Sequence, residues 1–286
     1  MALIYGANYS IAKVVMPLYI GPFGVIFIRV IVGTAIYWFI ASLTTKEKIK
    51  RKREYMQLAG LSLFGVAINQ LMFFKGLSYT TPITASVIMT SSPIVVLVVS
   101  YFILKERITA NKLIGIALGA IGAVLLIGIE GFSFSSETFI GNLFILINAT
   151  SFSIYLVLVK PLMYRYKAIT IIKWVFLFGS LFVIPFGFNE FIEIEWATLP
   201  YDAWLSLGYI IIATTFIAYL LNTWALNYVS PSVVGYYIYL QPVFSTFIAI
   251  TFRGDKLTLN EILYSALIFI GVYLVSVRRS KKLTGH

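Results

Sequence analysis

Long apolar stretches separated by short polar connections make up almost the whole chain. A helix needs about 20 apolar residues to cross the hydrocarbon core of a bilayer, and such stretches recur along the sequence. They cover residues 3–18, 23–43, 56–74, 84–104, 113–129, 140–159, 169–188, 204–226, 233–252 and 262–277. The pattern predicts an all-α integral membrane protein with ten transmembrane helices.

Two of these stretches resemble each other. GLSYTTPITASVIMTSSPIV (76–95) and ALNYVSPSVVGYYIYLQPVF (225–244) carry Leu, Tyr, Pro and Pro at the same four places, 149 residues apart. The offset pairs Leu77 with Leu226, Tyr79 with Tyr228, Pro82 with Pro231, Pro93 with Pro242 and Gly122 with Gly271. This repetition predicts two five-helix units, residues 1–130 and 138–279.

An odd number of spans in each unit makes the second unit enter the membrane from the opposite side. Inverted repeats of this kind are typical of secondary transporters, because similar halves of opposite orientation can open to either side. Pro93 and Pro242 interrupt equivalent spans, and each removes a backbone hydrogen bond whose acceptor needs a partner in the protein or in a hydrated cavity. We expect these prolines to act as hinges. The alternatives are structural kinks and a duplication retained for packing.

The net charge of +11 follows the loops in alternation. The basic loops hold Lys46, Lys48, Lys50, Arg51, Lys52 and Arg53; Lys105, Arg107 and Lys112; Lys160, Arg165 and Lys167; and Arg278, Arg279, Lys281 and Lys282. By the positive-inside rule, this distribution places both termini in the cytoplasm. We expect a prokaryotic plasma membrane location, and the charge gives no reason to predict nucleic-acid binding.

Composition excludes several other classes. Of the 286 residues, 60% are hydrophobic, 12% are charged and none is cysteine, whereas soluble domains have about 25% charged residues. No paired carboxylates, histidine cluster or nucleophile with its base lies within the spans, so a membrane enzyme is not expected. No cofactor is predicted.

Polar side chains inside the spans predict a central cavity. The predicted substrate-binding residues are Asn8, Lys13, Asn69, Gln70, Thr90, Ser92, Asn148, Trp224, Tyr236, Tyr239 and Gln241. Because a charge at the bilayer centre costs roughly 2.5 to 3.5 kcal/mol, neither Lys13 nor Arg29 is expected to face lipid. Lys13 is the expected partner for a substrate carboxylate, the alternative being a structural pair with an amide or carbonyl.

Several motifs resemble those of a known family. YGANYSIAK (5–13) is similar to the opening WG-x-N-x-x-x-x-K of EamA-type transporters in the drug/metabolite transporter superfamily. Further matches are Arg29, GLSYT (76–80), and SP (92–93) through KERIT (105–109). The resemblance covers nearly the whole chain. It implies a ten-helix inverted-repeat carrier, commonly an exporter of amino acids or related metabolites, with a cavity lined by spans one, three, four, six, eight and nine.

Two features depart from that family pattern. Tyr5 stands in place of the usual tryptophan and keeps an amphipathic ring. The first span is shorter than the sixth when Ser10 is aligned with Ser153, which suggests a truncated start.

The polar groups also bear on substrate and energy source. Tyrosines, amides and one or two cations suit a small zwitterion that carries a carboxylate. The alternatives are sugar derivatives or nucleotide sugars, which would need more cations, and cationic drugs. All acidic residues lie in loops or at span ends, and the only histidine is His286, so facilitated flow or exchange is expected rather than obligate proton coupling. The expected partners are the small-molecule substrate and the lipid bilayer, with the protein a monomer or weak homodimer.

Overall fold

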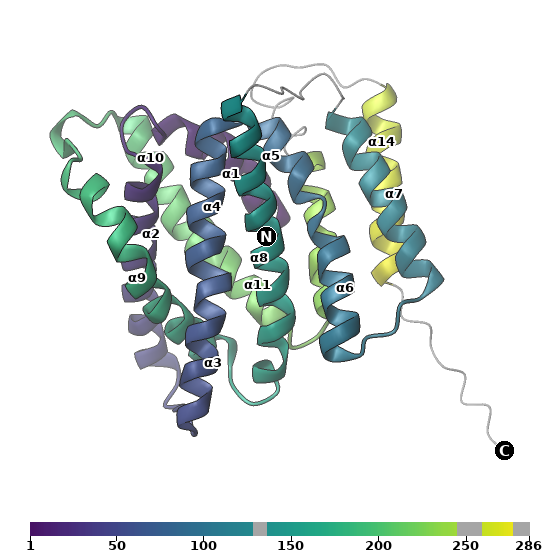
Figure 1. Ribbon diagram of the computed structural model, residues 1–286, viewed down its shortest axis with the longest axis horizontal. Coiled ribbons are helices and arrows are strands. Elements are labelled where there is room, and N and C mark those ends of the chain that lie inside the picture. Colours follow the sequence, from purple (N-terminus) through teal and green to yellow (C-terminus); the bar gives the residue numbers. More distant parts are fainter. Residues whose placement is uncertain (128–135, 245–258, 277–286) are drawn as a thin grey trace.

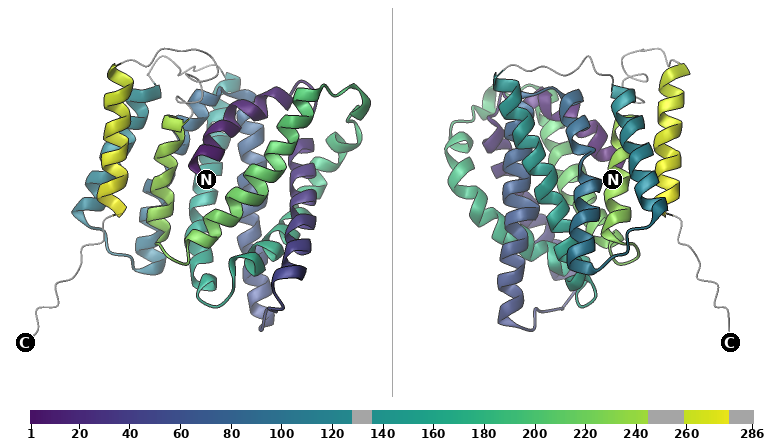
Figure 2. Two further views of the ribbon diagram at one scale, coloured as in Figure 1. Left: turned by 180° about the vertical axis from the view of Figure 1, so that it is seen from behind. Right: turned by 45° about the vertical axis from the view of Figure 1, so that its right-hand side comes forward.

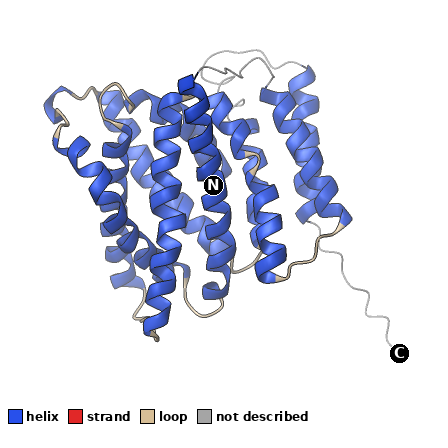
Figure 3. Ribbon diagram, viewed as in Figure 1, coloured by secondary structure: helices blue, strands red, loops and turns tan. Residues whose placement is uncertain are grey.

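The computed structural model describes residues 1–127, 136–244 and 259–276. Within these ranges every regular element is a helix and no strand occurs (Figure 3). The prediction of an all-α protein is therefore confirmed. Most of the long helices run alongside one another, parallel or antiparallel (Figure 1).

Besides the helical residues 240–244, seventeen helical elements follow one another in the described ranges. The first seven are α1 (Ala2–Val15), α2 (Pro22–Thr44), α3 (Lys52–Ser62), η1 (Leu63–Ala67), α4 (Ile68–Tyr79), α5 (Pro82–Met89) and α6 (Ser92–Leu104). Next come α7 (Ala110–Ile127), α8 (Ser136–Met163), α9 (Ala168–Ile192), η3 (Trp196–Thr198), α10 (Tyr201–Tyr209) and η4 (Ile210–Ala218). The last are α11 (Tyr219–Ala225), α12 (Pro231–Tyr236), η5 (Tyr237–Tyr239) and α14 (Leu259–Ser276).

Five helices in the described residues are long and apolar enough to cross a membrane: Pro22–Thr44, Lys52–Tyr79, Glu137–Met163, Ala168–Ile192 and Tyr201–Ala225. Shorter apolar helices cover Ser92–Leu104, Ala110–Gly122 and Ile262–Val275. Large apolar side chains such as Phe39, Phe102 and Trp204 are exposed on the outside. An outer surface of this kind suits contact with lipid rather than water.

The predicted span 84–104 is not one helix. α5 ends at Met89 and α6 begins at Ser92, with Pro93 in its first turn. A proline fits this position because the first turn leaves its N–H groups without helical partners anyway. Pro93 therefore begins a new helix instead of bending a continuous one. At the equivalent place, Pro242 lies within the helical residues 240–244, which follow α12 and η5, and residues 245–252 of the predicted span 233–252 lie outside the described residues.

Several elements recur at the offset of 149 residues. Residues 110–127 of α7 and residues 259–276 of α14 are helical at equivalent positions. Pro82 and Pro231 each begin a helix, α5 and α12. A π-helical turn interrupts the long helix in each half, as η1 and as η4. The local backbone therefore follows the sequence repeat.

Lys160 differs from its predicted place in a basic loop. It lies inside α8, is 7% exposed, and donates through Nζ to the carbonyl oxygens of Leu226 and Val229. These carbonyls belong to the turn that follows α11, where the last helical carbonyls have no backbone donor. An ammonium at a helix C-terminus is also favoured by the helix dipole, which explains why this lysine is buried.

α2 and α9 form one of the main contacts of the core, and a polar cap joins them at one end. Oε2 of Glu190 in α9 accepts hydrogen bonds from the backbone N–H of Phe23 at 2.7 Å and of Gly24 at 2.8 Å. These are orphan donors in the first turn of α2. The carboxylate therefore fixes the start of a membrane helix from a distant part of the chain.

α7 and α14 stand together at one edge of the molecule (Figure 2). Their approach depends on glycine, because a Cβ built on Gly271 would lie 2.6 Å from the carbonyl oxygen of Gly115 and 2.9 Å from the nitrogen of Gly119. Both obstacles are backbone atoms and cannot rotate away. Small residues allow such close packing between membrane helices.

We expect Gly271→Ala to lower the free energy of unfolding by about 1 to 3 kcal/mol, because the two backbones must move apart. Gly60→Ala is the matched control, since nothing lies within 4 Å of a Cβ at that helical position. The control should be neutral or slightly stabilising. Thermal unfolding of the two purified variants in the same detergent measures the difference. Equal unfolding temperatures would contradict the close packing of α7 and α14.

Candidate substrate cavity

A cavity lies among α1, α2, α4, α5, α8, α11 and α12. Its wall combines apolar side chains with a set of polar ones: Tyr5, Asn8, Tyr9, Arg29, Asn69, Gln70, Asn148, Tyr219, Asn222, Tyr237 and Gln241. Met1 and Ala2 also line it, and the chain begins near mid-height of the bundle in Figures 1 and 2. A concave wall that combines apolar side chains with buried polar groups is typical of a ligand site.

Tyr219 is the centre of the hydrogen bonds around the cavity. Its hydroxyl donates to Oδ1 of Asn69 at 2.8 Å, accepts from Nε2 of Gln70 at 3.1 Å and lies 3.1 Å from the carbonyl oxygen of Gly65. Gly65 belongs to the π-helical turn η1 and Tyr219 directly follows the π-helical turn η4. Turns of this type often occur at functional sites. Gln70 and Tyr219 are also equivalent positions of the two halves, separated by 149 residues.

Asn69 and Asn148 join α4 to α8. The side chain of Asn148 donates to the carbonyl oxygen of Asn69 at 2.6 Å, and the side chain of Asn69 donates to that of Asn148 at 3.4 Å. Tyr9 in α1 donates to Oε1 of Gln241 at 3.0 Å. Asn222 donates to the hydroxyl of Tyr5 at 3.1 Å. Side-chain hydrogen bonds in the cavity wall therefore connect helices that are far apart in sequence.

Arg29 supplies a positive charge to the wall. It is 4% exposed, and its guanidinium carbon lies 5.2 Å from the ring centroid of Phe74 and 5.9 Å from that of Tyr219. In the part of the chain that the structure describes, its Nε has no hydrogen-bond partner. Cation–π contacts of this kind offset part of the cost of burying the charge.

Five of the eleven predicted binding residues line the cavity: Asn8, Asn69, Gln70, Asn148 and Gln241. The other six, Lys13, Thr90, Ser92, Trp224, Tyr236 and Tyr239, are not among the described residues of its wall. Thr90 and Ser92 are buried at the break between α5 and α6.

The helical stretch 231–244, made of α12, η5 and residues 240–244, explains why Tyr236 and Tyr239 lie elsewhere. Val234, Ile238 and Gln241 face the cavity, at the spacing of one helical face. The two tyrosines lie on the other side, where Tyr236 donates to the carbonyl oxygen of Lys112 at 3.3 Å. A Cβ at Gly119 in α7 would lie 2.7 Å from the Tyr239 ring, so this ring packs against α7.

Lys13 and Trp224 also have other surroundings. Lys13 is half-buried in the last turn of α1, beyond the polar positions Tyr5, Asn8 and Tyr9. Trp224 is 49% exposed and its ring packs against Tyr228 with centroids 4.8 Å apart. An exposed tryptophan near a helix end suits the membrane interface.

Sequence reasoning left six polar residues out of the predicted site: Tyr5, Tyr9, Arg29, Tyr219, Asn222 and Tyr237. A helical signal was available for two of them, since Tyr5 and Tyr9 are spaced to share one face of a helix with the predicted residue Asn8. Asn222 follows Tyr219 by three residues in the same way. For Arg29, the signal was a charge within an apolar span.

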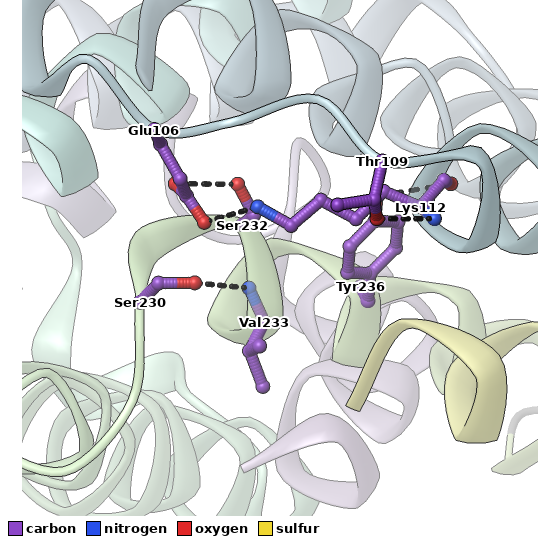
Figure 4. Close-up of polar contacts among 7 residues, drawn as sticks. All are labelled: Glu106, Thr109, Lys112, Ser230, Ser232, Val233 and Tyr236. Atoms are coloured by element: carbon purple, nitrogen blue, oxygen red, sulfur yellow. Dashed lines mark hydrogen bonds and ion pairs between the residues drawn. The ribbon is translucent and has the colours of Figure 1, made fainter. Parts of the chain in front are cut away.

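A second polar cluster lies where the loop between α6 and α7 meets the base of α12 (Figure 4). Glu106 forms an ion pair with Lys112 and accepts a hydrogen bond from the hydroxyl of Ser232 at 2.9 Å. Burial raises the pKa of the Glu106 carboxyl, but the hydrogen bonds and charge of Lys112, with the hydroxyls of Ser230 and Ser232, hold the pKa below its ordinary value of 4.5. This cluster fixes the base of the helix that forms one wall of the cavity.

The described residues contain no group of three or more His, Cys, Asp or Glu side chains that could hold a metal ion. The cavity wall is built from amides, hydroxyls, one guanidinium and apolar side chains. It can bind polar and charged groups of a small molecule, but it offers no acidic side chain in its described part.

Comparisons with known proteins agree with this architecture. The model of the EamA-like transporter family matches residues 1–128 and 139–277. An uncharacterized transporter of Archaeoglobus fulgidus is 27% identical over 231 residues, 79% of this chain and 78% of that protein. A second from the same organism is 25% identical over 265 residues and covers 91% of each chain. The uncharacterized transporter YetK of Bacillus subtilis is 22% identical over 232 residues, 80% of this chain and 70% of that protein.

A solved crystal structure has the same fold. It superposes with a TM-score of 0.75 at 20% sequence identity and covers 96% of this chain and 93% of that chain. At this identity the likeness concerns the fold alone. Together with the apolar helices, the bacterial and archaeal relatives identify a multi-pass membrane protein of transporter type.

Proposed function

Because the chain belongs to the EamA-like transporter family, we propose that it is a secondary transporter that exports amino acids or related small metabolites. The observation that carries this proposal is the cavity wall, where Arg29 and the amides Asn8, Gln70 and Asn148 lie buried among apolar side chains. Polar groups at membrane depth are costly and usually serve a substrate or ion pathway. Transport accounts for their presence better than packing does.

The proposed architecture is ten spans arranged as two inverted five-helix repeats, residues 1–130 and 138–279. Two observations support it: Pro82 and Pro231 begin helices at equivalent positions, and Gln70 contacts its equivalent Tyr219. Equivalent residues of two inverted halves can touch each other only close to a pseudo-twofold axis. An axis in the membrane plane would give the alternating access that such carriers use.

We place the protein in a prokaryotic plasma membrane with both termini in the cytoplasm. The support is the distribution of lysine and arginine between alternate loops. In this orientation the 105–109 loop and the base of α12 are cytoplasmic. Movement of the two halves around the cavity would use as hinges the break before Pro93, between α5 and α6, and the 3-10 turn η5 before Pro242.

A thermal-shift screen of the purified protein tests the substrate class. The panel contains amino acids, nucleotide sugars and cationic drugs, because a ligand that binds only the folded state raises its stability by about 2.7 kcal/mol at 100 times Kd. We expect stabilisation by amino acids, followed by their flux in proteoliposomes. Stabilisation by nucleotide sugars or cationic drugs alone would contradict the proposal.

Flux should not require a proton gradient, since no acidic side chain lines the described part of the cavity. In a counterflow assay, unlabelled amino acid inside proteoliposomes should drive entry of the labelled form with equal pH on both sides. Liposomes without protein provide the background. If flux appears only when a pH gradient is imposed, the transporter is proton-coupled and this expectation is wrong.

A further inference from the structure

The positive charge of Arg29 has no carboxylate to neutralise it in the described part of the chain. The ion pairs found there join Lys112 to Glu106 and Arg165 to Glu54, outside the cavity wall. The rings of Phe74 and Tyr219 take up part of the charge, but Nε of the guanidinium has no hydrogen-bond partner among the described residues. A buried cation without a carboxylate partner costs free energy, and an anionic group of a ligand would offset that cost.

The cavity also contains acceptors without donors. Three buried amide oxygens, Oδ1 of Asn8, Oε1 of Gln70 and Oδ1 of Asn148, have no hydrogen-bond partner within the described ranges. The amide nitrogen of Gln70 is bound to Tyr219 and that of Asn148 to the Asn69 carbonyl, so these two amides keep their oxygens free. Buried acceptors of this kind cost free energy unless a ligand supplies the donor.

We propose, on the basis of the transport function above, that the cavity binds one zwitterion in a fixed orientation. Its carboxylate pairs with the guanidinium of Arg29, and its ammonium donates to the free amide oxygens of Asn8, Gln70 and Asn148. Arg29 therefore replaces Lys13 as the carboxylate partner. An ammonium has three donors and no acceptor, which suits three oxygens without donors.

The remaining wall indicates the ligand side chain. Phe73, Met89, Phe152, Val234 and Ile238 line the same cavity and offer an apolar surface. An amino acid with an apolar side chain would contact the guanidinium, the amide oxygens and the apolar wall at the same time. An amine without a carboxylate would leave Arg29 unpaired, and a carboxylic acid without an amine would leave the amide oxygens unpaired.

The test compares three matched ligands in each of two series. One series is phenylalanine, phenethylamine and 3-phenylpropanoate, and the other is leucine, isopentylamine and 4-methylpentanoate. Binding is measured by thermal shift and by competition for counterflow of the labelled amino acid. The wild-type protein should bind each amino acid at least about tenfold tighter than its amine or its acid, since each lost charged contact leaves a buried partner unpaired.

Variants of the cavity wall test separately the binding of the carboxylate and the binding of the ammonium. Arg29→Gln should remove the preference for the amino acid over the amine, and Arg29→Lys should restore part of it because the charge remains. Asn8→Leu should reduce the preference over the acid. It is the mildest change at the amide oxygens, because Oδ1 of Asn8 has no hydrogen-bond partner among the described residues. Lys173→Gln is the control, since Lys173 also lies over a ring, 5.0 Å from the Trp38 centroid, but outside the cavity.

The outcomes distinguish this inference from the general function. If amino acids are transported but Arg29→Gln keeps the full preference for them over amines, Arg29 is not the carboxylate partner and the inference is wrong. If the wild-type protein binds none of the six compounds, or binds the amines as well as the amino acids, the zwitterion site is also wrong. If no amino acid of the wider panel binds or crosses the membrane, the proposed function itself fails. Should Arg29→Gln not fold, an unchanged ligand preference in Arg29→Lys and Asn8→Leu would equally overturn the inference.

Discussion

Replacing Tyr219 with phenylalanine is expected to lower the free energy of unfolding by about 2 kcal/mol and to reduce transport more than tenfold. The change removes one oxygen and leaves Oδ1 of Asn69, Nε2 of Gln70 and the carbonyl oxygen of Gly65 without that partner. Single interhelical hydrogen bonds in membranes contribute about 0.6 kcal/mol and at most about 1.7, so the loss of several contacts accounts for the expected effect.

The effect on transport has a separate cause. Asn69 and Gln70 are oriented by the Tyr219 hydroxyl, and both line the cavity. Without it, their amides can rotate and present different groups to the ligand. Tyr228→Phe is the matched control, because Tyr228 is 63% exposed and should tolerate the same change. Thermal unfolding and counterflow measure both effects, and a Tyr219→Phe variant as active and stable as the control would contradict the central role of this hydroxyl.

Replacing Glu106 with glutamine is expected to open the cavity to the face of the bundle that carries the 105–109 loop. The substitution removes the ion pair with Lys112 and weakens the bond to Ser232 at the base of α12. Val234, on the same helix, lines the cavity. Because charge-assisted contacts contribute about 1.5 to 3 kcal/mol, their loss can shift the population that exposes α12 by about tenfold.

The absence of cysteine from the sequence makes this measurable. A single Val234→Cys reporter, 3% exposed as valine, should react with a maleimide about tenfold faster when Glu106→Gln is also present. Arg107→Gln serves as the control, since Arg107 is exposed in the same loop. Equal labelling rates in the Glu106→Gln and Arg107→Gln backgrounds would rule out a closing role for the cluster.

The same contact should depend on pH. The folded protein holds the pKa of Glu106 below 4.5, so ionised Glu106 stabilises the folded state at pH values above 4.5. This stabilisation should be lost as the pH falls through the lowered pKa. The stability difference between the wild-type protein and Glu106→Gln should therefore be constant near neutral pH and shrink in acid.

Much of the fold could be predicted because apolar length and helical class are local properties. The all-helical membrane class followed directly from composition and pattern. Five of the predicted cavity residues line the cavity, because an amide inside an apolar span is costly in contact with lipid and faces the interior of the bundle. The offset of 149 residues also marked Gln70 and Tyr219 as equivalent positions. It did not show that the two side chains touch, because a repeat in sequence contains no information on how the copies dock.

The amino-acid sequence by itself determined that this chain consists mainly of apolar membrane helices, that a pattern of residues recurs after 149 positions, and that polar side chains lie inside the apolar stretches. Only the tertiary structure decided which of those groups meet. Along the helical stretch that begins at Pro231, Ile238 and Gln241 line the cavity while Tyr239 packs against α7. Packing between distant helices likewise buried Lys160 against the turn after α11 and turned Arg29, not Lys13, toward the cavity. The orientation of a helix about its own axis is set by its neighbours, and no local pattern fixes it.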